Sequence, residues 1–277
     1  MKQRPAVQRV SAVASDSAGS GAGFYCQEVC RFFESDRGAV TALDAVSFAV
    51  RPSEFVCIVG PSGCGKSTLL RIIAGLVEPS SGRIMFEGKD GADSARGGLV
   101  VQENGTFPWM TVLDNVAFGL EMRGVARKER HARAAEFLDR AGLGGFARHY
   151  PHELSVGMRQ RVGIGRAFVA NAPLLLMDEP FGALDAQTRW ALQSELLRVW
   201  SMHRKTVVFV THDIEEAILL GDRVLVMTGR PGRIREDIRV PLDRPRGVAR
   251  DQPLIGEIKS HIWTLLEEEV RSSLSIR

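Results

Sequence analysis

A nine-residue turn rich in glycine constrains this chain more than any other stretch of its sequence. It follows the short apolar run Phe55–Val59 and precedes a run of helical spacing from Lys66 to about Leu76. The turn fits the spacing G-x4-G-K-[ST]. Its residues are Gly60, Pro61, Ser62, Gly63, Cys64, Gly65, Lys66, Ser67 and Thr68. Because a chance match in a chain of this length has a probability on the order of 1%, we interpret it as a phosphate-binding turn.

The residue types in this turn suit a polyphosphate. Glycine lets the backbone approach an anion closely, and successive N–H groups and the helix N-terminus point at its oxygens. Lys66 is expected to reach the β- and γ-phosphates, the Ser67 hydroxyl to bind Mg²⁺, and Thr68 to contact the α-phosphate. Cys64 is interpreted as a filler of the turn, although the helix N-terminus and Lys66 could lower the pKa of its thiol.

Two carboxylates follow a second apolar run, Leu174–Met177. Asp178 stands at the carboxyl end of the expected strand, where open α/β sheets place their ligands, and it could hold Mg²⁺ through water. Glu179 comes next and could polarise an attacking water as a general base. An Asp-Glu pair after a strand is also a common helix start, but beside the phosphate-binding turn we favour the catalytic interpretation.

Composition and charge exclude several classes of protein. Of the 277 residues, 44% are hydrophobic and 25% are charged, and 36 Lys+Arg against 33 Asp+Glu give a net charge of +3. This balance is typical of a globular chain and indicates no nucleic-acid partner, so the basic cluster between Arg123 and Arg133 is interpreted as a solvated helix face. No apolar run approaches the ~18–20 residues that cross a bilayer. Four cysteines indicate neither a disulfide framework nor a metal site, and we expect a reducing, cytosolic environment.

Apolar runs of strand length alternate with runs of helical spacing, which predicts an α/β fold with a parallel core sheet. Residues 1–22 lack periodicity and are interpreted as a mobile tail. The main domain is expected over 23–245, with β-like runs at its start and a helical subdomain at about 104–170. Residues 246–277 form an expected helical extension with one apolar face.

Four further segments resemble those of the nucleotide-binding subunit of ABC transporters. They are Gln102, Leu154–Arg161, Gly182–Asp185 and Thr211–Asp213, which match the family's order and spacing across about residues 24–245. The family's signature is represented here by Leu154, Ser155, Val156, Gly157 and Met158. The resemblance implies that 23–245 is an ABC ATPase domain of the P-loop NTPase fold, with an antiparallel β subdomain at its start, and that its ligands are ATP and Mg²⁺.

By this resemblance, two chains bind head to tail and enclose two ATP molecules, each between the phosphate-binding turn of one copy and the signature of the other. Gln102 is then expected to contact Mg²⁺ and the attacking water, and His212 to bind the γ-phosphate and orient the nucleophile. Asp185 is expected to act across the interface between the copies. A helix N-terminus at Ser155 would supply the second set of anion-binding amides.

Two positions leave alternatives open. The third signature position is Val156 where the family has glycine. A β-branched residue resists a positive φ and adds bulk where a backbone amide should approach the phosphate. A partner subunit that binds ATP but hydrolyses it poorly is therefore an alternative. Adenine is expected to stack on Phe33, with Phe32 and Tyr25 as competitors.

The remaining motifs resemble those of importers for nitrate, sulfonate and taurine. Thr106–Val112 is similar to the importer segment near which a membrane subunit docks, and Met177–Arg189 is most similar to this group. The resemblance implies three kinds of partner at the cytoplasmic face of the cell membrane: transmembrane permease subunits, a substrate-binding protein, and a second copy or a homologous ATPase subunit. A soluble ATPase of the same family outside transport is the alternative, although no zinc-ligand or coiled-coil insertion is visible.

Overall fold

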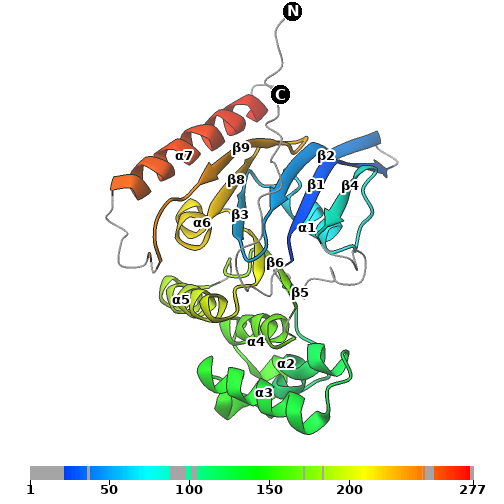
Figure 1. Ribbon diagram of the computed structural model, residues 1–277, viewed down its shortest axis with the longest axis vertical. Coiled ribbons are helices and arrows are strands. Elements are labelled where there is room, and N and C mark those ends of the chain that lie inside the picture. The colour runs from blue at the N-terminus through cyan, green and yellow to red at the C-terminus, as the bar shows by residue number, and fades with distance from the viewer. Residues whose placement is uncertain are drawn as a thin grey trace, which may run out of the picture.

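A computed structural model describes residues 22–35, 38–87, 98–100, 105–170, 172–182, 184–244, 246 and 253–274. The predicted tail, except for its last residue, lies outside these ranges. Figure 1 shows a central sheet with helices around it, a small antiparallel sheet beside β3, and a group of helices, α2 to α4, that projects from one end.

A three-stranded antiparallel sheet begins the described chain, in the order β2-β1-β4. Its strands are β1 (Phe24–Ser35), β2 (Gly38–Val50) and β4 (Ser81–Phe86). The second half of β2 buries Val46, Phe48 and Val50 in alternation, as a strand with one covered face does. Phe24 packs its ring 6.0 Å from that of Phe48 and 5.7 Å from that of Phe86, measured between centroids.

The core sheet has six strands in the order β5-β6-β7-β3-β8-β9. They are β3 (Phe55–Val59), β5 (Gly98–Val100), β6 (Leu174–Asp178), β7 (Thr206–Val210), β8 (Arg223–Met227) and β9 (Ile234–Arg239). The first five strands of this order are mutually parallel, as predicted, and β9 is added antiparallel to β8. β9 was not predicted from the sequence.

Helices cover both faces of the core sheet, which explains why β3, β6 and β7 are buried throughout. These helices are α1 (Lys66–Ile73), α5 (Ala186–His203), α6 (Ile214–Leu220) and α7 (Pro253–Leu274). Val56 and Ile58 pack with α1 and the antiparallel sheet, whereas Phe55 and Cys57 pack with α5, α6 and α7. Within the described ranges, no helix combines the length and the apolar character needed to cross a membrane.

The projecting helices form a subdomain with a core of its own. They are α2 (Val112–Glu121), α3 (Arg127–Arg140), the short 3-10 turns at Gly144–Phe146 and Pro151–Glu153, and α4 (Val156–Val169). Val112 and Val116 of α2, Leu138 of α3 and Val162 of α4 are all fully buried in one cluster. The long helix α4 therefore has one face in this cluster, while Ile164 and Phe168 reach the main core.

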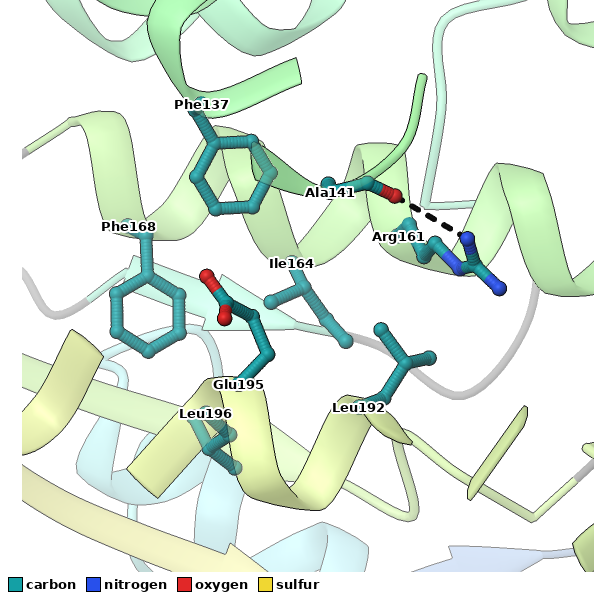
Figure 2. A pocket seen from close by; sticks show the side chains of 8 residues that line it. All are labelled: Phe137, Ala141, Arg161, Ile164, Phe168, Leu192, Glu195 and Leu196. Atoms are coloured by element: carbon teal, nitrogen blue, oxygen red, sulfur yellow. Dashed lines mark hydrogen bonds between the residues drawn. The ribbon is translucent and has the colours of Figure 1, made fainter. Parts of the chain in front are cut away.

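Figure 2 shows the boundary between this subdomain and the core, where Phe137 of α3 and Ile164 of α4 lie across from Leu192 and Leu196 of α5. Phe137 packs closely on α4, because a Cβ on Gly165 would lie 2.4 Å from the Phe137 Cε1 atom. The cavity left between these side chains measures about 20 Å³, which is room for about one water. We interpret it as a gap in an apolar packing boundary.

Lys205 joins the end of α4 to the start of β7. Its side chain is buried, and Nζ donates a hydrogen bond to the Phe168 carbonyl oxygen at 3.1 Å. The Trp200 indole N–H donates to the Lys205 carbonyl oxygen at 2.7 Å. Burial, with a smaller contribution from the charge of Arg123, lowers the pKa of the Lys205 ammonium to about 8.

This lowered pKa predicts a pH dependence of stability. The unfolded chain keeps a lysine pKa near 10.5 and so binds more protons than the folded protein between about pH 8 and 10.5. Relative to a Lys205→Met variant, the parent should therefore gain stability as pH rises through this window, by up to about 3 kcal/mol. Urea unfolding of both proteins at pH 7.5 and pH 10 measures the change. The cysteines titrate in both proteins, so their effect cancels when the two free energies of unfolding are subtracted. A difference between parent and variant that is constant with pH contradicts the prediction.

Candidate nucleotide-binding site

The glycine-rich turn runs from the end of β3 into α1, as predicted. Gly63 and Gly65 have φ values of +74° and +104°, in the region that residues with a side chain avoid. A Cβ on Gly65 would lie 2.7 Å from Leu43 Cδ2 and 2.9 Å from the Ala42 carbonyl oxygen, so β2 backs the turn closely. No side chain caps the N-terminus of α1, which leaves its first N–H groups as donors for an anion.

Lys66 folds its side chain back over the turn. Its Nζ donates to the carbonyl oxygens of Gly60 at 2.8 Å and Pro61 at 3.0 Å, and lies 3.9 Å from Cys64 Sγ. The suggestion that the pKa of the Cys64 thiol is lowered was wrong. Burial raises the pKa of Cys64 and outweighs the opposing effect of the Lys66 charge. Cys64 is therefore a packing residue of the turn, as the filler interpretation expected.

Ser67 and Asp178 meet at the start of α1. The Ser67 hydroxyl donates to Asp178 Oδ1 at 2.9 Å. Burial raises the pKa of Asp178, the hydrogen bond from Ser67 opposes this, and the neighbouring charge of Glu179 adds to it. A hydroxyl and a carboxylate are oxygen ligands of the kind that Mg²⁺ prefers. This pair fits a Mg²⁺ ion, and the amide-rich turn beside it fits the phosphates.

Glu179 and His212 form a second pair, at the ends of the neighbouring strands β6 and β7. Glu179 has a φ of +45°, and its N–H donates to the Val210 carbonyl oxygen at 3.0 Å. Such a backbone conformation is costly for a residue with a side chain and persists where its surroundings impose it. Glu179 Oε2 lies 3.0 Å from His212 Nδ1, and the His212 side chain is 60% exposed. The pair thus places a carboxylate and an accessible imidazole together.

The segment that carries His212 is held from behind by buried polar contacts. The Thr211 hydroxyl donates to Glu216 Oε2 at 2.5 Å, and Gln193 Nε2 donates to Glu216 Oε1 at 2.8 Å. Glu216 is 4% exposed, and burial raises its pKa. Because Gln193 lies on α5 and Glu216 on α6, both helices fix the backbone just before His212.

Asp185 lies at the start of α5 and is linked to the same region. Its Oδ1 accepts the N–H groups of Thr188 at 3.0 Å and Gln187 at 3.1 Å, and these hydrogen bonds lower its pKa. Arg189 Nη2 donates to the Leu184 carbonyl oxygen at 2.9 Å, and Arg189 Nη1 lies 3.4 Å from Asp213 Oδ2. Arg189 therefore connects the turn before α5 to the residue that follows His212.

The signature residues begin α4. Ser155 is the N-cap, and its hydroxyl accepts the Met158 N–H at 3.3 Å. Val156 is the first residue of the helix, is 51% exposed and does not have a positive φ. The backbone strain expected at Val156 is therefore absent. A Cβ on Gly157 would lie 3.1 Å from Leu184 Cδ2, so the signature lies against the segment that leads into Asp185.

Two of the predicted residues are not joined to this site by the described contacts. Gln102 lies outside the described residues. Phe33 lies on β1 opposite Val40 of β2, is 40% exposed, and has the Arg31 guanidinium 4.7 Å from its ring centroid. Phe32 and Tyr25 are exposed as well, so the choice of adenine-stacking residue stays a prediction.

Asn115 has a role that the sequence analysis missed. Its Oδ1 accepts the Phe107 N–H at 2.7 Å, and its Nδ2 donates to the carbonyl oxygens of Phe107, Met110 and Thr111 at 3.0 to 3.1 Å. Asn115 is fully buried, whereas Trp109 in the segment that it holds is 70% exposed. The sequence feature that could have revealed this role was an amide side chain among the apolar residues of α2.

The fold and this arrangement of residues define a phosphate-loop nucleotide-binding protein. A family model described as ABC transporter matches residues 43–182. An ABC transporter ATP-binding protein of Methanocaldococcus jannaschii is 47% identical over 252 residues, 90% of this chain and 92% of the relative. A taurine import ATP-binding protein of Rhizobium johnstonii is 48% identical over 248 residues (88% and 93%), and a nitrate import ATP-binding protein of Synechocystis is 46% identical over 216 (76% and 80%). The chain belongs to the ABC transporter family.

Solved structures agree with this assignment. A dimeric bacterial ABC transporter cassette is 33% identical with a TM-score of 0.72, and a dimeric cassette in a post-hydrolysis state bound to ADP and Pi is 33% identical with a TM-score of 0.71. Both alignments cover 79% of this chain and 100% of the solved chain. The predicted fold class is confirmed, and the chain is an ATP-hydrolysing protein of the transporter family.

The burial of Cys64 predicts its order of reaction with alkylating reagents. Cys64 is 1% exposed and its thiol pKa is raised, whereas Cys30 is only partly buried. We expect iodoacetamide to modify Cys30 before Cys64, and the first equivalent to leave ATP hydrolysis unchanged. Peptide mass spectrometry locates the label, and a Cys30→Ser variant serves as the control. Early labelling of Cys64 with loss of activity contradicts the prediction.

Proposed function

We propose that this chain is the energy-coupling ATPase subunit of an ABC importer for nitrate, sulfonate, taurine or a similar small anion. The observation that carries the proposal is the contact between Glu179 and His212, next to the contact between Ser67 and Asp178. A carboxylate that can accept a proton, a neighbouring imidazole and a metal-binding pair at one edge of the sheet are groups that suit the hydrolysis of a triphosphate. The names of the taurine and nitrate import relatives support the substrate class.

Each half of the site has a role in binding. The backbone of residues 60–68 binds the phosphates, and Lys66 releases the Gly60 and Pro61 carbonyls to pair with the β- and γ-phosphate oxygens. Ser67 and Asp178, whose oxygen atoms meet at the start of α1, are the residues that would hold Mg²⁺. When bound, Mg²⁺ neutralises charge on the phosphate oxygens. Phe33 stacks on adenine, with Phe32 and Tyr25 as the alternatives.

The proposed catalytic residues, Glu179 and His212, follow β6 and β7 at the same edge of the sheet. Glu179 accepts the proton of the attacking water, and its strained backbone holds the carboxylate toward His212. His212 binds the γ-phosphate and orients the water. The proposed role of Gln102, which lies outside the described residues, is to help hold Mg²⁺ and the same water. Thr211 and Glu216 keep His212 in place because their contact is buried beneath it.

A second copy of this chain, or a homologous subunit, completes each site by the proposed head-to-tail arrangement. Ser155 and the amides at the start of α4 bind the partner's γ-phosphate, and Asp185 acts across the interface. The two dimeric cassettes among the similar structures support a dimer. The helical backbone of Val156 removes the argument from backbone strain for a poorly hydrolysing partner subunit, whereas the argument from side-chain bulk keeps that subunit as the alternative.

The proposed partners are transmembrane permease subunits, which ATP binding and hydrolysis would drive. A substrate-binding protein would interact with this chain only indirectly, by way of those subunits. The segment that Asn115 holds presents Trp109 with 70% of its surface exposed, and an exposed indole is a common interface anchor. This docking puts the chain at the cytoplasmic face of the membrane. The proposed limits are 23–245 for the ATPase domain, with the helical subdomain at about 104–170, and 246–277 for the helical extension.

Two substitutions test the separate roles of binding and hydrolysis. Lys66→Ala should weaken MgATP binding at least tenfold, since a charged hydrogen-bond donor contributes roughly 1.5–3 kcal/mol. Glu179→Gln should keep the parent affinity, lower single-turnover hydrolysis by ~10²-fold or more, and accumulate a dimer in MgATP. Fluorescence titration, phosphate release and gel filtration measure these outcomes. Hydrolysis at the parent rate by Glu179→Gln would falsify the assignment of the general base.

A matched pair of tryptophan variants tests the permease surface. Trp109→Ser should reduce the fraction of tagged protein recovered with the membranes of its own cells, while ATP affinity stays unchanged. Trp263→Ser changes a residue that is 61% exposed on α7 and should leave membrane recovery unchanged. Quantitative blotting of the membrane and supernatant fractions gives the comparison. Equal membrane recovery of the parent and both variants would reject the segment around Trp109 as the surface that contacts the permease.

A further inference from the structure

The turn between β8 and β9, residues 228–233, lies directly behind the phosphate-binding turn. A Cβ on Gly232 would lie 2.0 Å from the Cys64 carbonyl oxygen, so only glycine fits there without displacing one of the two turns. Arg230 Nη2 donates to the Gly63 carbonyl oxygen at 3.2 Å. Two consecutive carbonyls of the phosphate-binding turn therefore face the β8–β9 turn.

These contacts determine where the amides of the phosphate-binding turn point. In a trans peptide, the C=O of one residue and the N–H of the next lie in one plane and point in opposite directions. Because the Cys64 carbonyl faces Gly232, the Gly65 N–H points away from the β8–β9 turn. The Gly63 carbonyl faces Arg230, and the Cys64 N–H correspondingly points back into its own turn, where it donates to the Pro61 carbonyl oxygen at 3.3 Å.

The β8–β9 turn is itself held from two sides. On one side, the Gly232 N–H donates to the Ala42 carbonyl oxygen at 3.0 Å, and the Asp44 N–H donates to the Gly232 carbonyl oxygen at 3.0 Å. On the other side, the Gly229 N–H donates to Glu269 Oε2 of α7 at 2.9 Å. Figure 1 shows α7 crossing over β9 and β8, with the described chain ending near that turn.

Glu269 is well placed to fix the turn. Its Oε1 accepts from Arg235 Nη1 at 2.7 Å, so the carboxylate is clamped between β9 and the turn. The Glu269 side chain is 19% exposed, which limits the competition from water. The neighbouring Glu268 also pairs with Arg235 but is 58% exposed and has no described contact with residues 228–233.

We propose that Glu269 is a positioning residue for nucleotide binding, and that α7 is in this way part of the ATP site. Glu269 holds Gly229, and the β8–β9 turn holds the Gly63 and Cys64 carbonyls. The Gly65 N–H shares a peptide plane with the Cys64 carbonyl and so keeps the orientation that a phosphate requires, while the Cys64 N–H stays bonded within its own turn. The inference rests on the proposed role of residues 60–68 as the phosphate-binding turn. Affinity gained by preorganised amides is lost when they are free to rotate.

The test compares Glu269→Ala with Glu268→Ala in the full-length protein. Both remove one acidic side chain from the same helix and one partner from Arg235, but only the first releases Gly229. We expect Glu269→Ala to raise the Kd for MgATP about fivefold and the KM for ATP by a similar factor, with kcat unchanged. Glu268→Ala should match the parent. Glu269→Gln, whose side-chain oxygen can still accept the Gly229 N–H, should return the affinity toward the parent value.

The remaining outcomes separate this inference from the proposed function. One outcome is that the parent binds MgATP and Lys66→Ala does not. If Glu269→Ala and Glu268→Ala then bind MgATP with equal affinity, the inference is overturned and the proposed function stands. If the parent itself does not bind MgATP, both the proposed function and this inference fail. Far-UV circular dichroism and urea midpoints of both variants test for unfolding. A fall in kcat for Glu269→Ala without a rise in KM also overturns the inference.

Discussion

The arrangement of the site depends on one constraint of topology, which is that β6, β7 and β3 are parallel neighbours and end at the same edge of the sheet. Three segments far apart in the chain therefore begin side by side. The phosphate-binding turn follows β3, Thr211 and His212 follow β7, and Glu179 follows Asp178, the last residue of β6. The Ser67–Asp178 hydrogen bond spans this edge, because Ser67 lies at the start of α1 after β3, Asp178 ends β6, and β7 lies between these two strands. A ligand bound at this edge contacts all three segments at once.

The groups at this edge are kept in place by contacts behind them. Glu216 and Gln193 hold Thr211 from α6 and α5, and Arg189 joins the start of α5 to the start of α6. Glu179 shows what such support permits, since its left-handed backbone is retained although it costs free energy. Gly157 of α4 lies against Leu184 and Thr188, at the segment that begins α5. The starts of α5 and α6 therefore hold the site residues in place, and the start of α5 also contacts the helical subdomain.

The sequence was sufficient for the fold class and for the elements that hold the motifs. The all-apolar runs at Phe55–Val59 and Leu174–Met177 predicted strands buried on both faces, and the structure has them there. β9 was missed because Ile234–Arg239 carries charges at most positions, which suits an edge strand but hides its pairing with β8. The backbone strain expected at Val156 assumed a positive φ at that position. The residue instead starts a helix.

Long-range contacts were beyond the sequence for a different reason. The position of Glu269 and the burial of Cys64 depend on which segments pack together, and local spacing carries no record of that. The lowered thiol pKa suggested for Cys64 counted the positive groups nearby and omitted burial, which acts in the opposite direction and is the larger effect. The prediction for Glu179, by contrast, rests on a motif that is continuous in the chain.

Asn115 has a consequence for recognition by another protein. Its amide makes four hydrogen bonds to the segment from Phe107 to Thr111, and the ring of Phe107 packs 4.7 Å from that of Phe118. The backbone around Trp109 is thus already ordered before any partner arrives. A docking surface built on a flexible loop would lose about 1–2 kcal/mol per residue in conformational entropy on binding. Here folding has already ordered the backbone that carries Trp109, so the proposed docking of a permease subunit on this segment would not have to order it again.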